Sequence, residues 1–142
     1  MSATLNLKSL VDKDMADLIA KYTLSVIKVS EEDVLLKASN FFIRVFADRD
    51  GLSMVYFDTA HRPVKGYNIF LFLVNKRRGL LTFSSTKPEK STYPKFIEDE
   101  LVSLVLHLKS AGQDILEGSK DWIATYSWPS VSAPESLMEL VI

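Results

Sequence analysis

The stretch FFIRVFADRDGLSMVYFD, residues 41–58, consists of two apolar runs separated by a short charged segment. Polar residues alternate with apolar ones in the runs 41–47 and 52–57, which is typical of strands with one buried and one partly solvated face. Between the runs, the pair Asp50-Gly51 tolerates the positive φ angles that tight hairpin turns require. The sequence therefore predicts an antiparallel hairpin here.

The chain before this hairpin contains a helical pattern followed by shorter β-rich runs. Apolar residues recur at three- and four-residue spacings over 7–22, which predicts one amphipathic helix. Ser9 or Asp12 is expected to cap its start, because either side chain can accept from the free amides of a first turn. Two short strands are predicted over 24–29 and 34–38.

The chain after the hairpin contains a run, residues 67–74, that is apolar at nearly every position. With the polar turn 75–79 and the apolar run 80–83, it predicts a second hairpin, central in the sheet. A short buried helix over 67–74 is the competing interpretation, because periodicity does not separate the two structures in so short a run.

A long helix is predicted to begin at Pro94, since a first helical turn does not need the missing amide hydrogen. Val102 and Leu106 widen its apolar face, so we expect little of this helix to be exposed before it ends near Gly112. A last short helix is predicted over 134–142. The main apolar face of the long helix comprises Ile97, Leu101, Leu104, Val105 and Leu108.

These elements predict an α+β fold with an N-terminal helix, an antiparallel β-meander of about five to six strands, and a long C-terminal helix packed on the sheet. The chain of 142 residues has the usual size of one domain, so residues 1–142 are expected to form a single domain. With 47% hydrophobic and 25% charged residues, it has an ordinary globular composition.

The absence of cysteine excludes several classes of site: disulfides, thiolate zinc sites, iron–sulfur clusters and cysteine nucleophiles. The first residues show no secretory-signal pattern, so a cytoplasmic protein is expected. The longest nearly uninterrupted apolar run, residues 69–74, is far shorter than the roughly 20 residues that a membrane-spanning helix needs. We therefore expect no membrane span.

Charge is distributed unevenly along the chain, with a net −2 over residues 1–61, +7 over 62–95 and −6 over 96–142. This asymmetry indicates either contact surfaces for a charged partner or segments that neutralise each other in the fold. The candidates for partner binding are Lys76, Arg77, Arg78, Lys87, Lys90, Glu98, Asp99, Glu100, Asp114 and Glu117.

Few residues suggest catalysis, and no catalytic residue, cofactor or metal site is predicted. Five scattered glycines form no phosphate-binding fingerprint, and neither histidine has a helical partner of metal-site type. The cluster 98–100 is expected to stabilise the first turn of the long helix. An alternative is a small enzyme whose site combines distant residues, pairing His61 or His107 with a carboxylate such as Asp58 or Glu100.

A second alternative is a nucleic-acid-binding domain that uses the basic segment 62–95, in which aromatic residues are interleaved. Against it, most of those aromatics fall in runs too apolar to be exposed stacking platforms, and the sequence pI is about 6.1. Its phosphate contacts would come from Lys76, Arg77, Arg78, Lys87 and Lys90.

The order of elements, with Ile115-Leu116-Glu117-Gly118 before Trp122, resembles small bacterial immunity-type proteins of toxin–immunity systems. The resemblance implies a domain that binds and blocks a cognate toxin, and it carries no catalytic residues over to this chain. We therefore expect a non-enzymatic protein-binding domain with a protein partner, and a homodimer is a further possibility.

Overall fold

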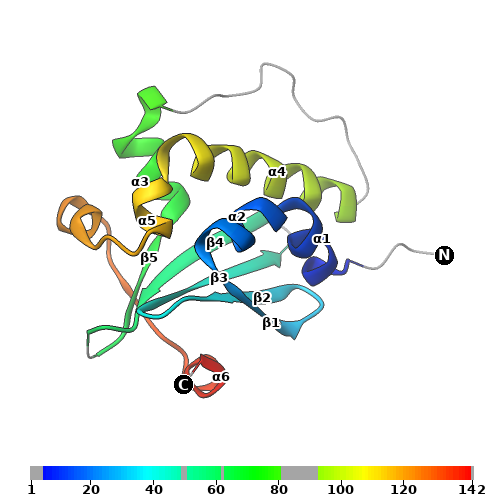
Figure 1. Cartoon of the computed structure of the whole chain (residues 1–142), viewed down its shortest axis with the longest axis horizontal. Coiled ribbons are helices and arrows are strands. Elements are labelled where there is room, and N and C mark those ends of the chain that lie inside the picture. Colours follow the sequence, from blue (N-terminus) through cyan, green and yellow to red (C-terminus); the bar gives the residue numbers. More distant parts are fainter. Residues whose placement is uncertain (1–4, 49–50, 62, 81–92, 142) are drawn as a thin grey trace.

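The computed structural model describes residues 5–48, 51–61, 63–80 and 93–141. Its centre is an antiparallel sheet with strands in the order β1-β2-β3-β4-β5-β6, so every strand pairs with its neighbour in sequence (Figure 1). This meander, with helices before and after it, confirms the predicted α+β fold. The strands are β1 (Ser25–Ser30), β2 (Asp33–Lys37), β3 (Phe41–Asp48), β4 (Gly51–Asp58), β5 (Lys65–Asn68) and β6 (Val131–Ser132).

The hairpin predicted from residues 41–58 is confirmed as β3 and β4. Their register runs without a shift from Phe41 opposite Asp58 to Asp48 opposite Gly51. Gly51 has a φ of 130°, which L-residues with a side chain rarely adopt. The glycine is therefore required where β4 begins.

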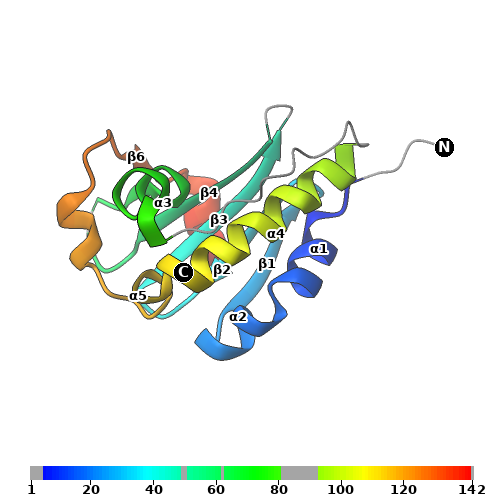
Figure 2. The ribbon, with the colours of Figure 1, turned by 90° about the horizontal axis from the view of Figure 1, so that it is seen from above.

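Helices cover the two faces of the sheet unequally. On one face α4 lies between α3 on one side and α1 and α2 on the other (Figure 2), whereas α6 lies on the opposite face (Figure 1). The α-helices are α1 (Leu7–Asp14), α2 (Ala16–Tyr22), α3 (Ile69–Lys76), α4 (Tyr93–Ala111), α5 (Gln113–Leu116) and α6 (Glu135–Val141). The 3-10 turns among the described residues are η1 (Arg78–Leu80) and η2 (Asp121–Thr125).

The predicted single N-terminal helix is wrong in two respects. It is broken at Met15, whose φ of −108° and ψ of 11° separate α1 from α2. Its cap is Asn6, whose side chain accepts from the amide of Ser9 at 3.2 Å, rather than Ser9 or Asp12. The apolar spacing continues through the break, because Met15 and Leu18 are both buried, and so periodicity does not reveal it.

The predicted second hairpin is also wrong, and the competing interpretation of residues 67–74 as a short helix is the better one. Asn68 ends β5 and caps α3, since its side-chain oxygen accepts from the amide of Leu71 at 2.9 Å. Leu80 lies in η1, and residues 81–83 lie outside the described residues. The sheet takes its sixth strand from the C-terminal segment instead.

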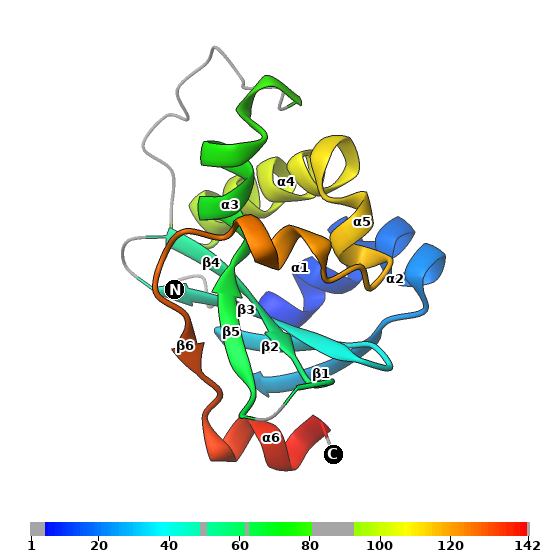
Figure 3. The same cartoon turned by 90° about the vertical axis from the view of Figure 1, so that its left-hand side faces the viewer.

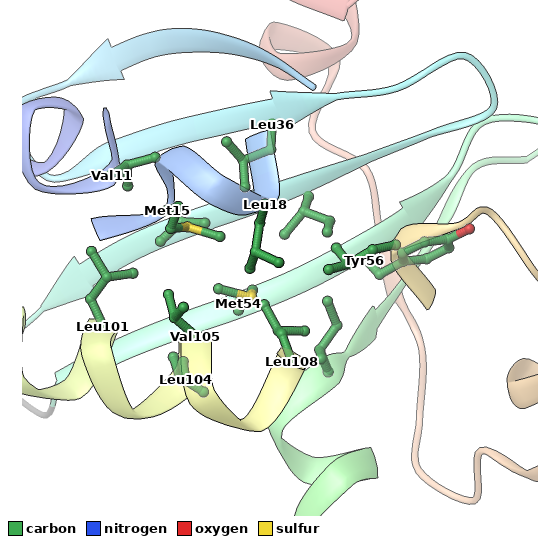
Figure 4. Packing of buried hydrophobic residues seen from close by; sticks show 14 of the residues in the cluster. Val11, Met15, Leu18, Leu36, Met54, Tyr56, Leu101, Leu104, Val105 and Leu108 are labelled. Carbon is green, nitrogen blue, oxygen red and sulfur yellow. The ribbon is translucent and has the colours of Figure 1, made fainter. Parts of the chain in front are cut away.

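The main core lies between the sheet and the helices α1, α2 and α4. Figure 4 shows Met15 and Leu18 meeting Leu101 and Val105 over the sheet residue Met54. A smaller core lies on the opposite face, where the rings of Phe42 and Phe57 stack at 4.8 Å and α6 covers them. The buried residues of the smaller core are Leu35, Phe42, Phe57, Val64, Leu137 and Val141.

The long helix α4 begins and ends as predicted, but more of it is exposed than expected. Val102 is 44% exposed and Leu106 is 52% exposed, one turn apart on the side that faces away from the sheet. They lie on that side because only the row containing Leu101, Leu104 and Leu108 points at the strands. In the part of the chain described, no helix is long and apolar enough to cross a membrane.

Candidate functional site

The basic and acidic segments meet at Arg77 and Asp114. The Arg77 guanidinium donates to both carboxylate oxygens of Asp114, at 2.5 and 2.8 Å, and to the carbonyl of Ala111 at 2.7 Å. The hydrogen bonds from Arg77 outweigh burial and hold the pKa of Asp114 below its usual value. These two candidates for partner binding therefore neutralise each other within the fold.

Two other basic candidates, Lys76 and Arg78, are exposed. Lys76 is exposed at the end of α3, with its ammonium 5.8 Å from the ring centroid of Trp128. Arg78 is exposed in η1. Lys87 and Lys90, needed by both the partner-binding and the nucleic-acid hypotheses, lie outside the described residues.

The acidic candidates Glu98 and Asp99 have partners of their own. Glu98 pairs with Lys13 of α1 at 2.6 Å, and Asp99 pairs with Lys95 at 2.8 Å on the same helix. Because α4 begins at Tyr93, both residues lie beyond its first turn, and the expectation that they stabilise that turn is wrong. Glu98 instead links α4 to α1.

Two further acidic candidates lie in contrasting surroundings. Glu100 points at the start of β4, where it accepts from the amide of Leu52, and its Oε1 is buried without a hydrogen-bond partner. Burial, together with repulsion from Asp48, raises its pKa despite the hydrogen bond from Leu52. Glu117 is exposed at the end of α5. Glu100 is thus positioned by the fold, whereas Glu117 is available to a partner.

An apolar patch lies on the outer side of α3 and α4, and we define it as Phe70, Val102 and Leu106. Phe70 is 44% exposed, and its ring stacks on His107 with centroids 6.2 Å apart. His107 itself is buried, and this burial lowers its pKa. His107 thus serves the contact between α3 and α4, beside the exposed Leu106.

A polar cluster is centred on Asp58, the last residue of β4, which is only 5% exposed. Its Oδ2 accepts from Nδ1 of His61 at 2.6 Å. Its Oδ1 accepts from the amide of Ala60 at 3.0 Å and lies 3.0 Å from the ammonium of Lys120. Both oxygens are therefore occupied by donors.

These donors decide the charge state of the cluster. Burial opposes ionisation of Asp58, but the hydrogen bonds from Lys120, His61 and Ala60 together lower its pKa. An ionised carboxylate only accepts hydrogen bonds, so Nδ1 of His61 must carry the proton. In the neutral imidazole the second nitrogen, Nε2, is then an acceptor on a side chain that is 73% exposed.

Lys120 joins this cluster from the C-terminal part of the chain. Its ammonium donates to the hydroxyl of Tyr56 at 2.6 Å and to the carbonyl of Asn40 at 2.8 Å, in addition to pairing with Asp58. Burial and the charge of Asp58 raise the pKa of Tyr56 far above its usual value. Lys120 is therefore a fixed positive charge that ties the segment before η2 to the sheet.

A cavity of about 370 Å³ opens beside this cluster, between β5 and η2. The turn that follows α5, orange in Figure 3, runs beside β5. It is held there by contacts of Tyr67 with the rings of Trp122 and Tyr126, at 5.9 and 5.1 Å. The residues lining the cavity are Asp58, His61, Pro63, Lys65, Tyr67, Lys120, Ile123 and Ala124.

The sequence anticipated only part of this site. Asp58 and His61 were among the residues proposed for a catalytic pair, and the structure brings them together. Tyr56 and Lys120 were missed, because 64 positions separate them and no spacing rule joins a strand residue to a distant turn. Among the described residues, no group of three or more potential ligands could hold a metal ion.

Comparison with protein families, with curated proteins and with solved structures found no match to this chain. Its function must therefore be argued from its own geometry.

Proposed function

We propose that this chain is a non-enzymatic protein-binding domain, and specifically an immunity protein that binds and neutralises a cognate bacterial toxin. The observation that carries the proposal is the apolar patch of Phe70, Val102 and Leu106, each between 44% and 52% exposed. Because Phe70 stacks on His107, the residue after Leu106, α3 and α4 bring these exposed apolar side chains to one side of the molecule, as is typical of protein interfaces. The toxin would cover this patch with apolar side chains of its own.

Charge around the patch supports the same proposal. Lys109 and Asp99 lie on α4 with partly exposed side chains, at 44% and 35%, so they can form a polar rim around the apolar centre. Rim charges chiefly speed encounter and select the partner, whereas the buried centre supplies most of the affinity. Arg77 and Asp114 satisfy each other, and we assign them to the fold rather than to the interface.

The test is co-expression with the product of the neighbouring gene, with co-purification and rescue from toxicity as readouts. Leu106→Asp should abolish rescue and weaken binding by at least about 2 kcal/mol, because it places a charge at the centre of the interface. Leu140→Asp is the matched control, since Leu140 is 45% exposed on α6 at the opposite face. Failure of the wild-type protein both to co-purify and to rescue would contradict the proposal.

A second candidate function, a small enzyme, is favoured by one observation: the 2.6 Å contact of His61 with Asp58 at the edge of a cavity. In such a pair the carboxylate fixes the tautomer and stabilises the imidazolium, while Nε2 takes a proton from water or from a substrate hydroxyl. This arrangement supplies a general base, and the described residues that line the cavity include no serine or cysteine nucleophile.

The enzyme candidate is tested with a panel of carboxylic and phosphoric esters. Turnover above the buffer rate that disappears in His61→Ala would support it, provided that circular dichroism shows the variant to be folded. Equal rates for wild type and variant would contradict it, because the imidazole is the group assigned to proton transfer.

A further inference from the structure

The cavity beside Asp58 has an excess of positive charge. The Asp58 carboxylate is already compensated by the ammonium of Lys120 and by a hydrogen bond from His61. Lys65 also lines the cavity and is exposed, and its side-chain ammonium forms no ion pair or hydrogen bond with any described residue. Among the described residues that line the cavity, its ammonium is therefore the uncompensated charge.

The occupancy of Asp58 also argues against a cationic ligand. One of its oxygens accepts from His61, and the other accepts from the amide of Ala60 and faces Lys120. Three contacts thus take up most of the roughly four lone-pair sites of the carboxylate, and Lys120 already balances its charge, so the site offers little to a metal ion or an amine. An anion, in contrast, could pair with the ammonium of Lys65 without displacing any contact.

The remaining walls are mainly apolar. Pro63, Ile123 and Ala124 contribute aliphatic surface, and Tyr67 contributes an aromatic ring that is fixed by Trp122 and Tyr126. The volume of about 370 Å³ lies at the lower end of the range for small-molecule sites, which is roughly 300–1,000 Å³. A ring or short aliphatic group of a ligand fits these walls.

We propose that this cavity binds a small organic anion, in which a carboxylate or a phosphate monoester is attached to a compact apolar body. The anionic group pairs with the ammonium of Lys65, and the apolar body lies against Tyr67, Ile123 and Ala124. A hydroxyl on the same ligand can donate to Nε2 of His61.

This inference is independent of the toxin-binding proposal, because the cavity lies between β5 and η2 whereas the apolar patch lies on α3 and α4. For the enzyme candidate, it names the class of substrate. Binding is measured directly and without turnover, so a lack of enzymatic turnover would not affect the binding result. A failure to bind would likewise be distinguishable from a lack of turnover.

The experiment is an NMR titration of the full ¹⁵N-labelled chain with three probes: benzoate, phenyl phosphate and benzyl alcohol. We expect saturable shifts of the amides of Lys65, Ile123 and Ala124 with at least one of the two anions. Benzyl alcohol has the same ring without the charge, and should bind about tenfold more weakly or worse. Comparison of the two anions distinguishes a carboxylate ligand from a phosphate ligand.

The variant Lys65→Met removes the charge from an exposed side chain and should weaken anion binding by about tenfold. Lys76→Met is the matched control, because Lys76 is an exposed lysine at the end of α3 and does not line the cavity; it should leave binding unchanged. Three results would overturn the proposal: no saturable shift with either anion, equal affinity for benzyl alcohol, or undiminished binding by Lys65→Met.

Discussion

A carboxylate lies at each end of β4, and the pKa shifts of the two carboxylates have opposite directions although burial raises the pKa of both. At the C-terminal end of β4, Asp58 is ionised more readily than usual because Lys120, His61 and a backbone amide donate to it. At the N-terminal end of β4, Glu100 lies against Gly51, accepts from one backbone amide, and is harder to ionise than usual. The number of donors, rather than burial itself, decides whether a carboxylate stabilises this fold.

The largest expected effect comes from removing the carboxylate that has the donors. Asp58→Asn should lower the free energy of unfolding by about 3 kcal/mol, because Lys120 loses its counter-charge at a site where it is only 23% exposed. Urea denaturation at neutral pH measures the change. Asp121→Asn, at an exposed position of η2, is the control and should stay near wild type. Equal stability of the two variants would contradict the claim that the ionised Asp58 carboxylate stabilises the fold.

The next effect concerns the glycine against which Glu100 packs. Gly51→Ala should destabilise the fold by about 2 kcal/mol, because its φ of 130° suits only glycine and the new methyl group would meet the Glu100 carboxylate. Gly79→Ala is the control, since no described residue other than its chain neighbours lies within 4 Å of a Cβ at that position. Thermal unfolding that shows the same midpoint for both variants would contradict the strain argument.

Neutralising Glu100 should act in the opposite direction to neutralising Asp58. Glu100→Gln is expected to stabilise the fold by about 1 kcal/mol at neutral pH, because it removes a charge that is desolvated without full compensation. Glu117→Gln, on an exposed side chain, is the control. Chemical denaturation that shows Glu100→Gln to be less stable than wild type would show that its charge is favourable.

The same contrast predicts two pH dependences of stability. The folded pKa of Glu100 is raised above 4.5, so its penalty is present above that raised value and is relieved as pH falls towards 4.5. The folded pKa of Asp58 is lowered below 3.8, so its contribution is present above 3.8 and is lost as pH falls through the folded value. Urea denaturation across pH 3–8 should show the gain of Glu100→Gln only at the upper end.

The smallest effect is expected from His61. Its side chain is 73% exposed, so His61→Ala should cost only about 0.5 kcal/mol in unfolding experiments. In the wild type, long-range ¹H–¹⁵N NMR spectra should show the proton on Nδ1, as the contact with Asp58 requires. A neutral ring protonated on Nε2 would remove the basis of the enzyme candidate.

The parts of the fold that follow from local chemistry could be predicted from the sequence. The hairpin of β3 and β4 follows from alternating residues around an Asp-Gly pair, and α4 follows from a proline start and an apolar row. The break at Met15 and the helix α3 could not be predicted from periodicity, because Met15 keeps the apolar spacing and residues 69–74 are apolar all round. For α3, the only local signal was Asn68 as a cap.

The candidate site was predictable only where its residues are close in sequence. Asp58 and His61 are three positions apart, at a strand end and in the loop after it, so their contact depends on local structure. Lys120 reaches them only because η2 packs on β5 through the rings of Tyr67 and Trp122. Tertiary packing of that kind leaves no periodic trace in the sequence.

The consecutive order of the strands implies an order of events in folding. Few residues separate each of the strands β1 to β4 from the next, so each pairing closes a small loop at little entropic cost, and this part of the sheet can form early. The strand β6 must instead reach Lys65 and Gly66 from Val131 and Ser132, across a long intervening chain. We therefore expect this edge of the sheet to be completed last, so that the proposed ligand site beside β5 would form only at the end of folding.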